Sequence, residues 1–129
     1  MRCGCNRLGC FETLIAGPGL TRLTAALVSV QAPAPELMRL RSSDPEMQGV
    51  WDIWRKINAE LLHSLILMVY PDVIILGGGL SKIDGIAADL QTAQSNIQLS
   101  VLKNAEILYA QGGDTSGARG AAFVAWRNV

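Results

Sequence analysis

Several features that often reveal a protein's function are scarce in this chain of 129 residues. Aromatic residues make up only 5% of it, which argues against a platform for stacking nucleic-acid bases. Its 11 basic and 11 acidic residues cancel, and they form no basic block or stripe. We therefore expect no nucleic-acid contact and no attraction to a membrane surface from these residues.

Long hydrophobic runs are also missing. The best apolar stretch, 61–76, is interrupted by His63, Pro71 and Asp72, and it is too short to span a bilayer. The first residues lack the apolar core of a signal peptide. We therefore expect no membrane association and a cytoplasmic location, where thiols stay reduced.

Cysteine is absent after residue 10, yet Cys3, Cys5 and Cys10 crowd into a C-x-C-x4-C pattern. An odd number of cysteines in a reducing compartment argues against disulfides. Three thiolates in one tight loop suit a tetrahedral zinc ion, although a structural zinc takes four ligands. A zinc loop with an incomplete ligand set and a loop of free thiols both remain open.

The single histidine, His63, lies in the middle of an apolar helical pattern. We interpret it as a residue on the flank of that helix, with one ring nitrogen bonded or solvated. A role as the fourth zinc ligand is the alternative. The fourth ligand is therefore expected to lie outside this chain.

The first half of the chain is predicted to be helical. Gly17-Pro18-Gly19 should divide 11–30 into a short helix and a longer one. Asp44, followed by proline, should cap a long helix that ends near Tyr70. The predicted apolar face of this helix consists of Val50, Trp54, Ile57, Leu61, Leu65 and Met68.

The second half predicts a strand, a helix, a strand and a helix. Residues 73–76 form a short β-branched run typical of a buried parallel strand, and 106–110 form a second one. Helices are expected to end near 98 and 126. Two strands cannot cover these helices, so the chain is predicted to be half of a larger α/β unit.

Three segments resemble the ROK family, which contains transcriptional repressors and sugar kinases. They are "CGCNRLGCFETLIAGPGL", "YPDVIILGGGLS" and "GGDTSGARGAAFVAW". They resemble the family's C-G-C-G-x-x-G-C-x-E, P-D-x-[IV]-[IV]-L-G-G-G-x-S and G-D-x-x-G-x-R-G-A-A segments, in the family's order. The last one is most similar to the branch of bacterial fructokinases and N-acetylhexosamine kinases. Asn6 and Ala16 replace a glycine and a serine of the pattern, and asparagine tolerates the left-handed backbone.

The resemblance implies part of an actin-like ATPase domain of the ribonuclease H-like class, with short parallel strands and helices behind a zinc-binding loop. Residues 1–129 would form one partial domain, the C-terminal portion of a kinase. Its parts would be a zinc loop (1–10), a helical part (11–70) and a nucleotide-side strand-helix-strand-helix unit (71–129).

The resemblance also implies roles for particular residues. Cys3, Cys5 and Cys10 match the zinc ligands, whose fourth partner in the family is a histidine of an upstream G-E-x-G-H segment. Glu12 matches a glutamate that accepts hydrogen bonds from sugar hydroxyls; a glutamate favoured by the helix dipole is the simpler explanation. The glycines 77–79 match a turn that lies against the adenosine of ATP.

The chain contains neither the family's D-x-G-G-T phosphate loop nor the N-D segment that carries the catalytic base. Asp84, Asp89 and Asp114 are interpreted as helix-flanking or capping groups, so no catalytic residue is assigned. We therefore expect the C-terminal part of an ATP- and Mg-dependent kinase of a hexose, such as fructose, or of an N-acetylhexosamine, inactive alone. The sugar-binding body of a repressor is the alternative.

The half-sheet of this chain leaves apolar surface open. The chain should therefore self-associate or pair with the missing N-terminal half.

Overall fold

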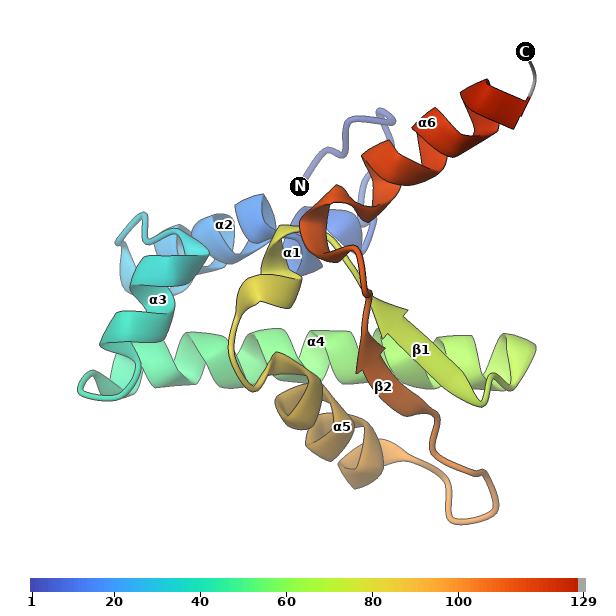
Figure 1. Cartoon of the computed structure of the whole chain (residues 1–129). Helices are drawn as coiled ribbons and strands as arrows, with labels where there is room; N and C mark the ends of the chain where they lie inside the picture. Colours follow the sequence, from blue (N-terminus) through green and yellow to red (C-terminus); the bar gives the residue numbers. More distant parts are fainter. Residues whose placement is uncertain (128–129) are drawn as a thin grey trace.

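The computed structural model describes residues 1–127, which combine helices with one small parallel sheet. This agrees with the predicted α/β class. Figure 1 shows the long helix α4 running behind the sheet, with α5 crossing below it and α6 leading away from the body. The elements are α1 (Glu12–Ile15), α2 (Gly17–Val28), α3 (Ala34–Leu40), α4 (Pro45–Val69), β1 (Val73–Leu76), α5 (Ile86–Ile97), β2 (Glu106–Tyr109), α6 (Ser116–Arg127) and the 3₁₀ helices η1 (Gly79–Lys82) and η2 (Gly113–Thr115).

The ends of α4 follow from local chemistry, as predicted. The Asp44 carboxylate accepts hydrogen bonds from the backbone N–H groups of Glu46 (2.9 Å) and Met47 (3.3 Å). These bonds satisfy two of the free donors at the helix start. At the other end, Tyr70 adopts a left-handed backbone with φ of 44°, and Pro71 follows. Both predicted boundaries of this helix are confirmed.

The predicted break between the first two helices is confirmed, but it falls one residue earlier. Ala16 is extended and separates α1 from α2, so the glycine-proline-glycine triplet forms the first turn of α2. Gly19 is required there because a Cβ at this position would clash with the backbone of Leu14. The two helices can therefore approach closely enough to hold α1 in place.

The predicted apolar face of α4 is wrong in its second half. Val50 and Trp54 are buried, but Leu61 and Leu65 are only half-buried and Met68 is 70% exposed. The C-terminal turns are apolar on every side, so periodicity alone could not select the inward face. The buried residues of this helix are Met47, Val50, Trp51, Trp54, Asn58, Ala59, Leu62 and Ile66.

The two strands pair in parallel, as predicted. The register runs from Val73 opposite Glu106 to Leu76 opposite Tyr109. Ile107 is 6% exposed and joins the main hydrophobic core, against which Ile74 packs. The chain therefore covers one face of this sheet with its helices.

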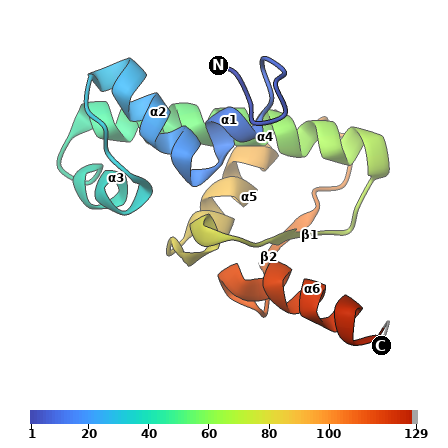
Figure 2. The same ribbon diagram turned by 90° about the horizontal axis from the view of Figure 1, so that it is seen from above.

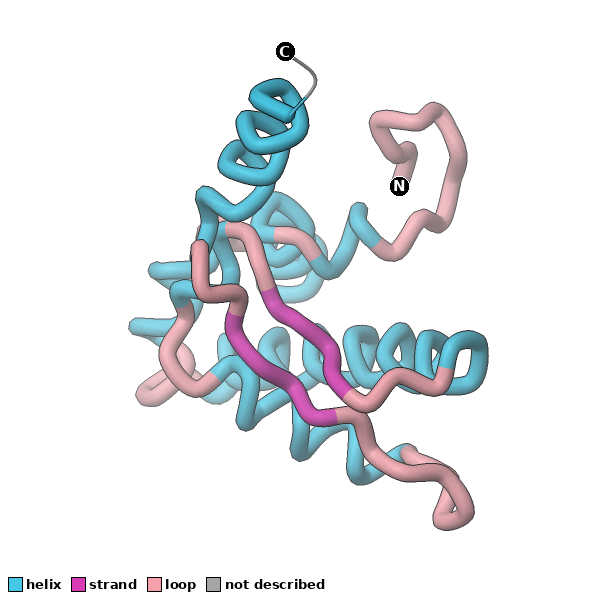
Figure 3. The backbone as a smooth tube through the Cα atoms, turned by 45° about the vertical axis from the view of Figure 1, so that its right-hand side comes forward, coloured by secondary structure: helices cyan, strands magenta, loops and turns pink. Residues whose placement is uncertain are grey.

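The opposite face of the sheet is open, as predicted for a half-sheet, so the buried strand that the pattern of 73–76 predicted is not buried within this chain. Val73 is 41% exposed, Ile75 58% and Leu108 40%. Figure 3 looks onto the two strands with helices behind them. Within residues 1–127 no further layer covers these side chains.

The two edges of the sheet differ. On the outer edge of β2, the Gln91 side chain donates to the Ala105 carbonyl (3.1 Å) and accepts from the Ile107 N–H (3.0 Å). This side chain from α5 thus occupies backbone groups that an added strand would need. The other edge of β1 pairs with no strand in the described part of the chain.

The last helix lies against little of the body. Every residue of α6 except the first is exposed, and Phe123, Val124 and Trp126 are 54%, 59% and 75% exposed. Figure 2 shows this helix leaving the body beside the strands. Over residues 1–127, none of the helices has the combination of length and apolar character needed to cross a membrane.

Candidate sugar and nucleotide cleft with an adjacent thiol cluster

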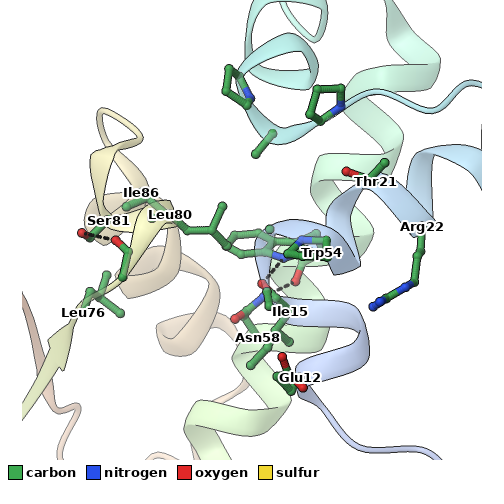
Figure 4. A pocket seen from close by; sticks show the side chains of 18 of the residues that line it. Glu12, Ile15, Thr21, Arg22, Trp54, Asn58, Leu76, Leu80, Ser81 and Ile86 are labelled. Carbon is green, nitrogen blue, oxygen red and sulfur yellow. Dashed lines mark hydrogen bonds between the residues drawn. The ribbon is translucent and has the colours of Figure 1, made fainter. Parts of the chain in front are cut away.

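One large cleft brings together residues that are far apart in the sequence. It has a volume of about 1090 Å³ and lies between α1, α2, the start of α3, α4 and the turn after β1. Figure 4 shows Trp54 in its middle, between Leu80 and the end of α1. Both predicted ligand-binding features, Glu12 and the glycines 77–79, line this one cleft. A volume of this order is large enough for a small ligand.

Glu12 stands at the start of α1, which three hydrogen bonds anchor. The Thr13 hydroxyl donates to the Cys10 carbonyl (2.7 Å), and the Arg22 guanidinium donates to the Thr13 carbonyl (3.0 Å). The indole N–H of Trp54 donates to the Ile15 carbonyl (3.0 Å). This four-residue helix is too short to be stable alone. The position of Glu12 therefore depends on these contacts with the thiol loop, α2 and α4.

The three glycines of the turn differ in whether the backbone requires glycine. Gly78 has φ of 79° and ψ of −174°, a conformation that is essentially restricted to glycine. Gly77 and Gly79 have no such constraint: a Cβ at Gly77 would meet only Ala110, at 3.8 Å, and one at Gly79 would meet nothing within 4 Å. Nothing in the described chain requires glycine at these two positions. A glycine at either position would let another molecule or segment approach the backbone closely.

The three cysteines form one compact cluster. Their sulfur atoms all lie within 4.8 Å of one another, and Cys5 Sγ is 3.6 Å from Cys10 Sγ. Sulfur atoms around a tetrahedral zinc lie about 3.8 Å apart, given Zn–S bonds of about 2.3 Å. The donor set therefore fits three corners of a zinc site after movements of about 1 Å.

The loop around the cluster is a small hairpin. Arg2 pairs with Leu8 across it, and the Cys3 N–H donates to the Arg7 carbonyl (2.9 Å). Asn6 adopts φ of 66°, the left-handed conformation expected for the asparagine that replaces a family glycine. The Cys3 thiol donates to the Glu12 carboxylate (3.6 Å). The thiol cluster and the cleft are thus in direct contact.

Contacts within the loop change the pKa values of two of the three thiols. The Arg7 side chain, through its hydrogen bond, lowers the pKa of Cys5 to about 7. The hydrogen bond with Cys5 raises the pKa of Cys10 to about 11, because that thiol supplies the proton to its neighbour. Cys5 therefore becomes a thiolate more readily than Cys10 near neutral pH.

His63 lies apart from the thiol cluster. Its Nδ1 is 3.3 Å from the Oε1 of Gln98, which agrees with the interpretation of a partly buried histidine with one bonded nitrogen. The only group of potential metal ligands found among residues 1–127 consists of the three cysteines. Among the described residues no fourth side chain joins this group, although the Glu12 carboxylate lies 3.6 Å from Cys3 Sγ.

Sequence reasoning missed residues that line the cleft and one residue that joins helices near it. Trp54 and Asn58 both line it, yet the sequence suggested only an apolar helix face. Asp89, interpreted as a helix-flanking group, instead contacts Trp51 (2.9 Å), Arg41 (3.3 Å) and Arg55 (3.7 Å). No periodicity marks such long-range partners.

Comparisons with known proteins identify the class of protein to which this cleft belongs. The sequence model of the ROK family matches residues 1–128, and the chain belongs to that family. A solved ROK hexokinase from Thermus thermophilus superimposes with a TM-score of 0.77 at 27% identity, over 100% of this chain and 45% of that one. A ROK glucokinase from Streptomyces griseus, solved with glucose and AMPPNP, gives 0.72 at 22% identity, over 96% and 46%, and supports the fold alone. The predicted fold of ROK kinases is thus confirmed, whereas zinc binding is not.

Among particular proteins, the chain is similar to N-acetylhexosamine kinases. It is 37% identical over 123 residues to the N-acetylgalactosamine kinase AgaK of Shewanella sp. strain ANA-3. It is 32% identical over 124 residues to the N-acetyl-D-glucosamine kinase of Salmonella paratyphi B. These alignments cover 95% of this chain but only 40% and 41% of the relatives. The chain therefore spans less than half the length of the curated relatives it matches.

Proposed function

We propose that this chain forms the sugar-side and nucleotide-side part of an ATP-dependent N-acetylhexosamine kinase. The observation that carries this proposal is the single cleft lined by both Glu12 and the glycines 77–79. Glu12 accepts hydrogen bonds from sugar hydroxyls, and the glycine turn admits the adenosine of a Mg–ATP complex. The relatives favour an N-acetylhexosamine over fructose or another hexose. They also favour a kinase over the sugar-binding body of a repressor.

Sugar binding is tested by calorimetric titration of the 129-residue chain with N-acetylglucosamine, N-acetylgalactosamine, fructose, glucose and mannose. Loss of a charged hydrogen-bond acceptor should weaken binding at least about tenfold in Glu12→Gln. The matched control is Glu60→Gln, an exposed glutamate of α4 that does not line the cleft. Equal affinities of the two variants, or a clear preference for fructose, would contradict the proposal.

We further propose that the 129-residue chain alone does not transfer phosphate. Its sequence holds no D-x-G-G-T loop and no N-D segment, and the absence of a positioned base alone costs about 10²–10⁴-fold in rate. A coupled assay with the same five sugars and Mg–ATP should stay at background. Turnover that disappears in Glu12→Ala would contradict the proposal and reveal a catalytic group among these residues.

We propose that Cys3, Cys5 and Cys10 hold a structural zinc ion whose fourth ligand comes from outside these residues. The support is the compact set of three sulfur donors. Affinity should be lower than at a complete four-ligand site. Elemental analysis of protein purified without added zinc provides the test, with Cys5→Ser lowering the zinc content and His63→Ala leaving it unchanged. Loss of stoichiometric zinc in His63→Ala would overturn this ligand set.

We also propose that the chain associates, either with itself or with a partner that supplies the N-terminal half of a kinase. Its surface of 8158 Å² exceeds by about 1,500 Å² what a folded monomer of 13.8 kDa normally exposes. This excess is as large as a standard protein interface. A monomer in sedimentation experiments at tens of micromolar, with a cooperative thermal transition, would argue against association.

A further inference from the structure

The turns that follow the two strands lie side by side at the carboxyl end of the sheet. The first leads through the glycines 77–79 into η1, and the second leads into η2. The two turns meet through an ion pair between Lys82 Nζ and Asp114 Oδ2 at 2.6 Å. This contact joins segments that are 32 residues apart in the sequence and that both follow directly from paired strands.

Each turn is internally ordered by its own hydrogen bonds. In the first, the Ser81 hydroxyl donates to the Gly78 carbonyl (2.7 Å). In the second, the Thr115 hydroxyl donates to the Gly112 carbonyl (2.9 Å). These bonds shape each turn but do not set the distance between them. Both turns also bend at a glycine with positive φ, 79° at Gly78 and 55° at Gly113. The last backbone bond between the two strands runs from the Ala110 N–H to the Leu76 carbonyl (2.8 Å), and both bends lie beyond it.

Beyond that backbone bond, the second turn contacts the body mainly through the first turn. The helix that follows it, α6, consists almost entirely of exposed residues and does not press the turn against the body. Lys82 is therefore placed to keep the second turn against the first. Its charge also lowers the pKa of Asp114, through the hydrogen bond between the two side chains.

We propose that Lys82 and Asp114 are positioning residues for nucleotide binding: their ion pair holds the second turn beside the glycine turn. This inference rests on the proposed function, because it assumes that the glycine turn receives a nucleoside triphosphate. Neither side chain needs to touch the nucleotide. The pair instead sets the width of the carboxyl-end edge to which the adenosine binds.

The expected effect is modest and selective. The side chains are 67% and 41% exposed, and ion pairs of that kind contribute little to global stability. Breaking the pair should weaken nucleotide binding about two- to fivefold without moving the denaturation midpoint. The chain offers a matched control at the opposite end of the same strands, where Lys103 Nζ contacts Asp72 Oδ1 at 2.9 Å. That pair is exposed to 69% and 84% and lies away from the glycine turn.

The experiment is a titration of the 129-residue chain with AMPPNP and Mg²⁺. It compares wild type, Lys82→Glu, Asp114→Lys and the double charge swap, with the corresponding three variants at Lys103 and Asp72. Each single variant at 82 and 114 should lose about two- to fivefold in affinity, and the swap should restore it, because opposite charges again face each other. The control variants should bind like wild type.

Other results would refute either the positioning role or the nucleotide assignment. Wild-type affinity in all variants would refute the positioning role and leave the nucleotide proposal standing. A different result would show that Lys82 contacts the phosphates directly. In that case Lys82→Glu would weaken AMPPNP binding, Asp114→Lys would strengthen it, and the double swap would not restore the wild-type affinity. Absence of AMPPNP binding in wild type would refute the nucleotide assignment and this inference together.

Discussion

Replacing Asp89 with asparagine should destabilise the fold although Asp89 lies outside the cleft. Its carboxylate accepts the indole N–H of Trp51 at 2.9 Å and lies 3.3 Å and 3.7 Å from the guanidinium groups of Arg41 and Arg55. The Arg41 guanidinium also stacks 4.7 Å above the Trp51 ring. Asp89→Asn keeps the shape and an acceptor for Trp51 but removes the negative charge between two cations.

The magnitude follows from distance and exposure. Two unit charges 3.3 Å apart attract by about 5 kcal/mol at an effective dielectric constant of about 20. The side chains of Asp89 and Arg41 remain 29% and 24% exposed, so water screens part of this attraction. We expect Asp89→Asn to lower the free energy of unfolding by about 2 kcal/mol. This value lies between the small effect of breaking an exposed ion pair and the larger effect of breaking a buried one.

Urea denaturation followed by tryptophan fluorescence measures this change, since Trp51 and Trp54 are stacked in the core with ring centroids 4.5 Å apart. The protein concentration should be the same for all variants because association would shift the midpoint. Asp84→Asn, an exposed aspartate just before α5, is the matched control. If both variants unfold within about 0.5 kcal/mol of wild type, the Asp89 contacts do not contribute as argued.

Three further perturbations test local features of the fold. Asp44→Ala should lower the free energy of unfolding by about 1 kcal/mol through loss of the α4 cap, and an unchanged urea midpoint would refute the cap. Gly19→Ala should lower the thermal midpoint and also weaken sugar binding, because a Cβ there pushes α1 and its glutamate away; a normal midpoint would show that α1 relaxes freely. In metal-free protein at pH 7, iodoacetamide should modify Cys5 faster than Cys10, since the pKa of Cys5 is lowered to about 7 and that of Cys10 is raised to about 11. Peptide mass spectrometry gives both rates, and the reverse order would contradict the role of Arg7.

Local signals in the sequence predicted much of the secondary structure. The cap at Asp44, the break before α2 and the strand Val73–Leu76 each depend on a few neighbouring residues. The inward face of α4 was only partly predictable, because its last two turns carry apolar residues on all sides. Which of them is buried depends on where α5 crosses, and that is a property of the tertiary structure.

The candidate site was likewise only partly predictable from the sequence. The motif resemblance indicated Glu12 and the three cysteines, and the structure places them within hydrogen-bonding reach of each other through Cys3. It could not indicate that Trp54 anchors α1 through the Ile15 carbonyl. A side chain that holds a backbone carbonyl 39 residues away leaves no local pattern.

The capping of one sheet edge by Gln91 limits how this chain can assemble. A sheet with two free edges can recruit strands on both sides and grow without end, as fibrils do. Here a side chain of the same molecule occupies the Ala105 carbonyl and the Ile107 N–H on the β2 edge, whereas the β1 edge pairs with no strand in residues 1–127. Strand addition is therefore favoured at the β1 edge, and a second copy joined there edge to edge would cover the edge of both molecules. Growth by strand addition alone would then stop at two copies.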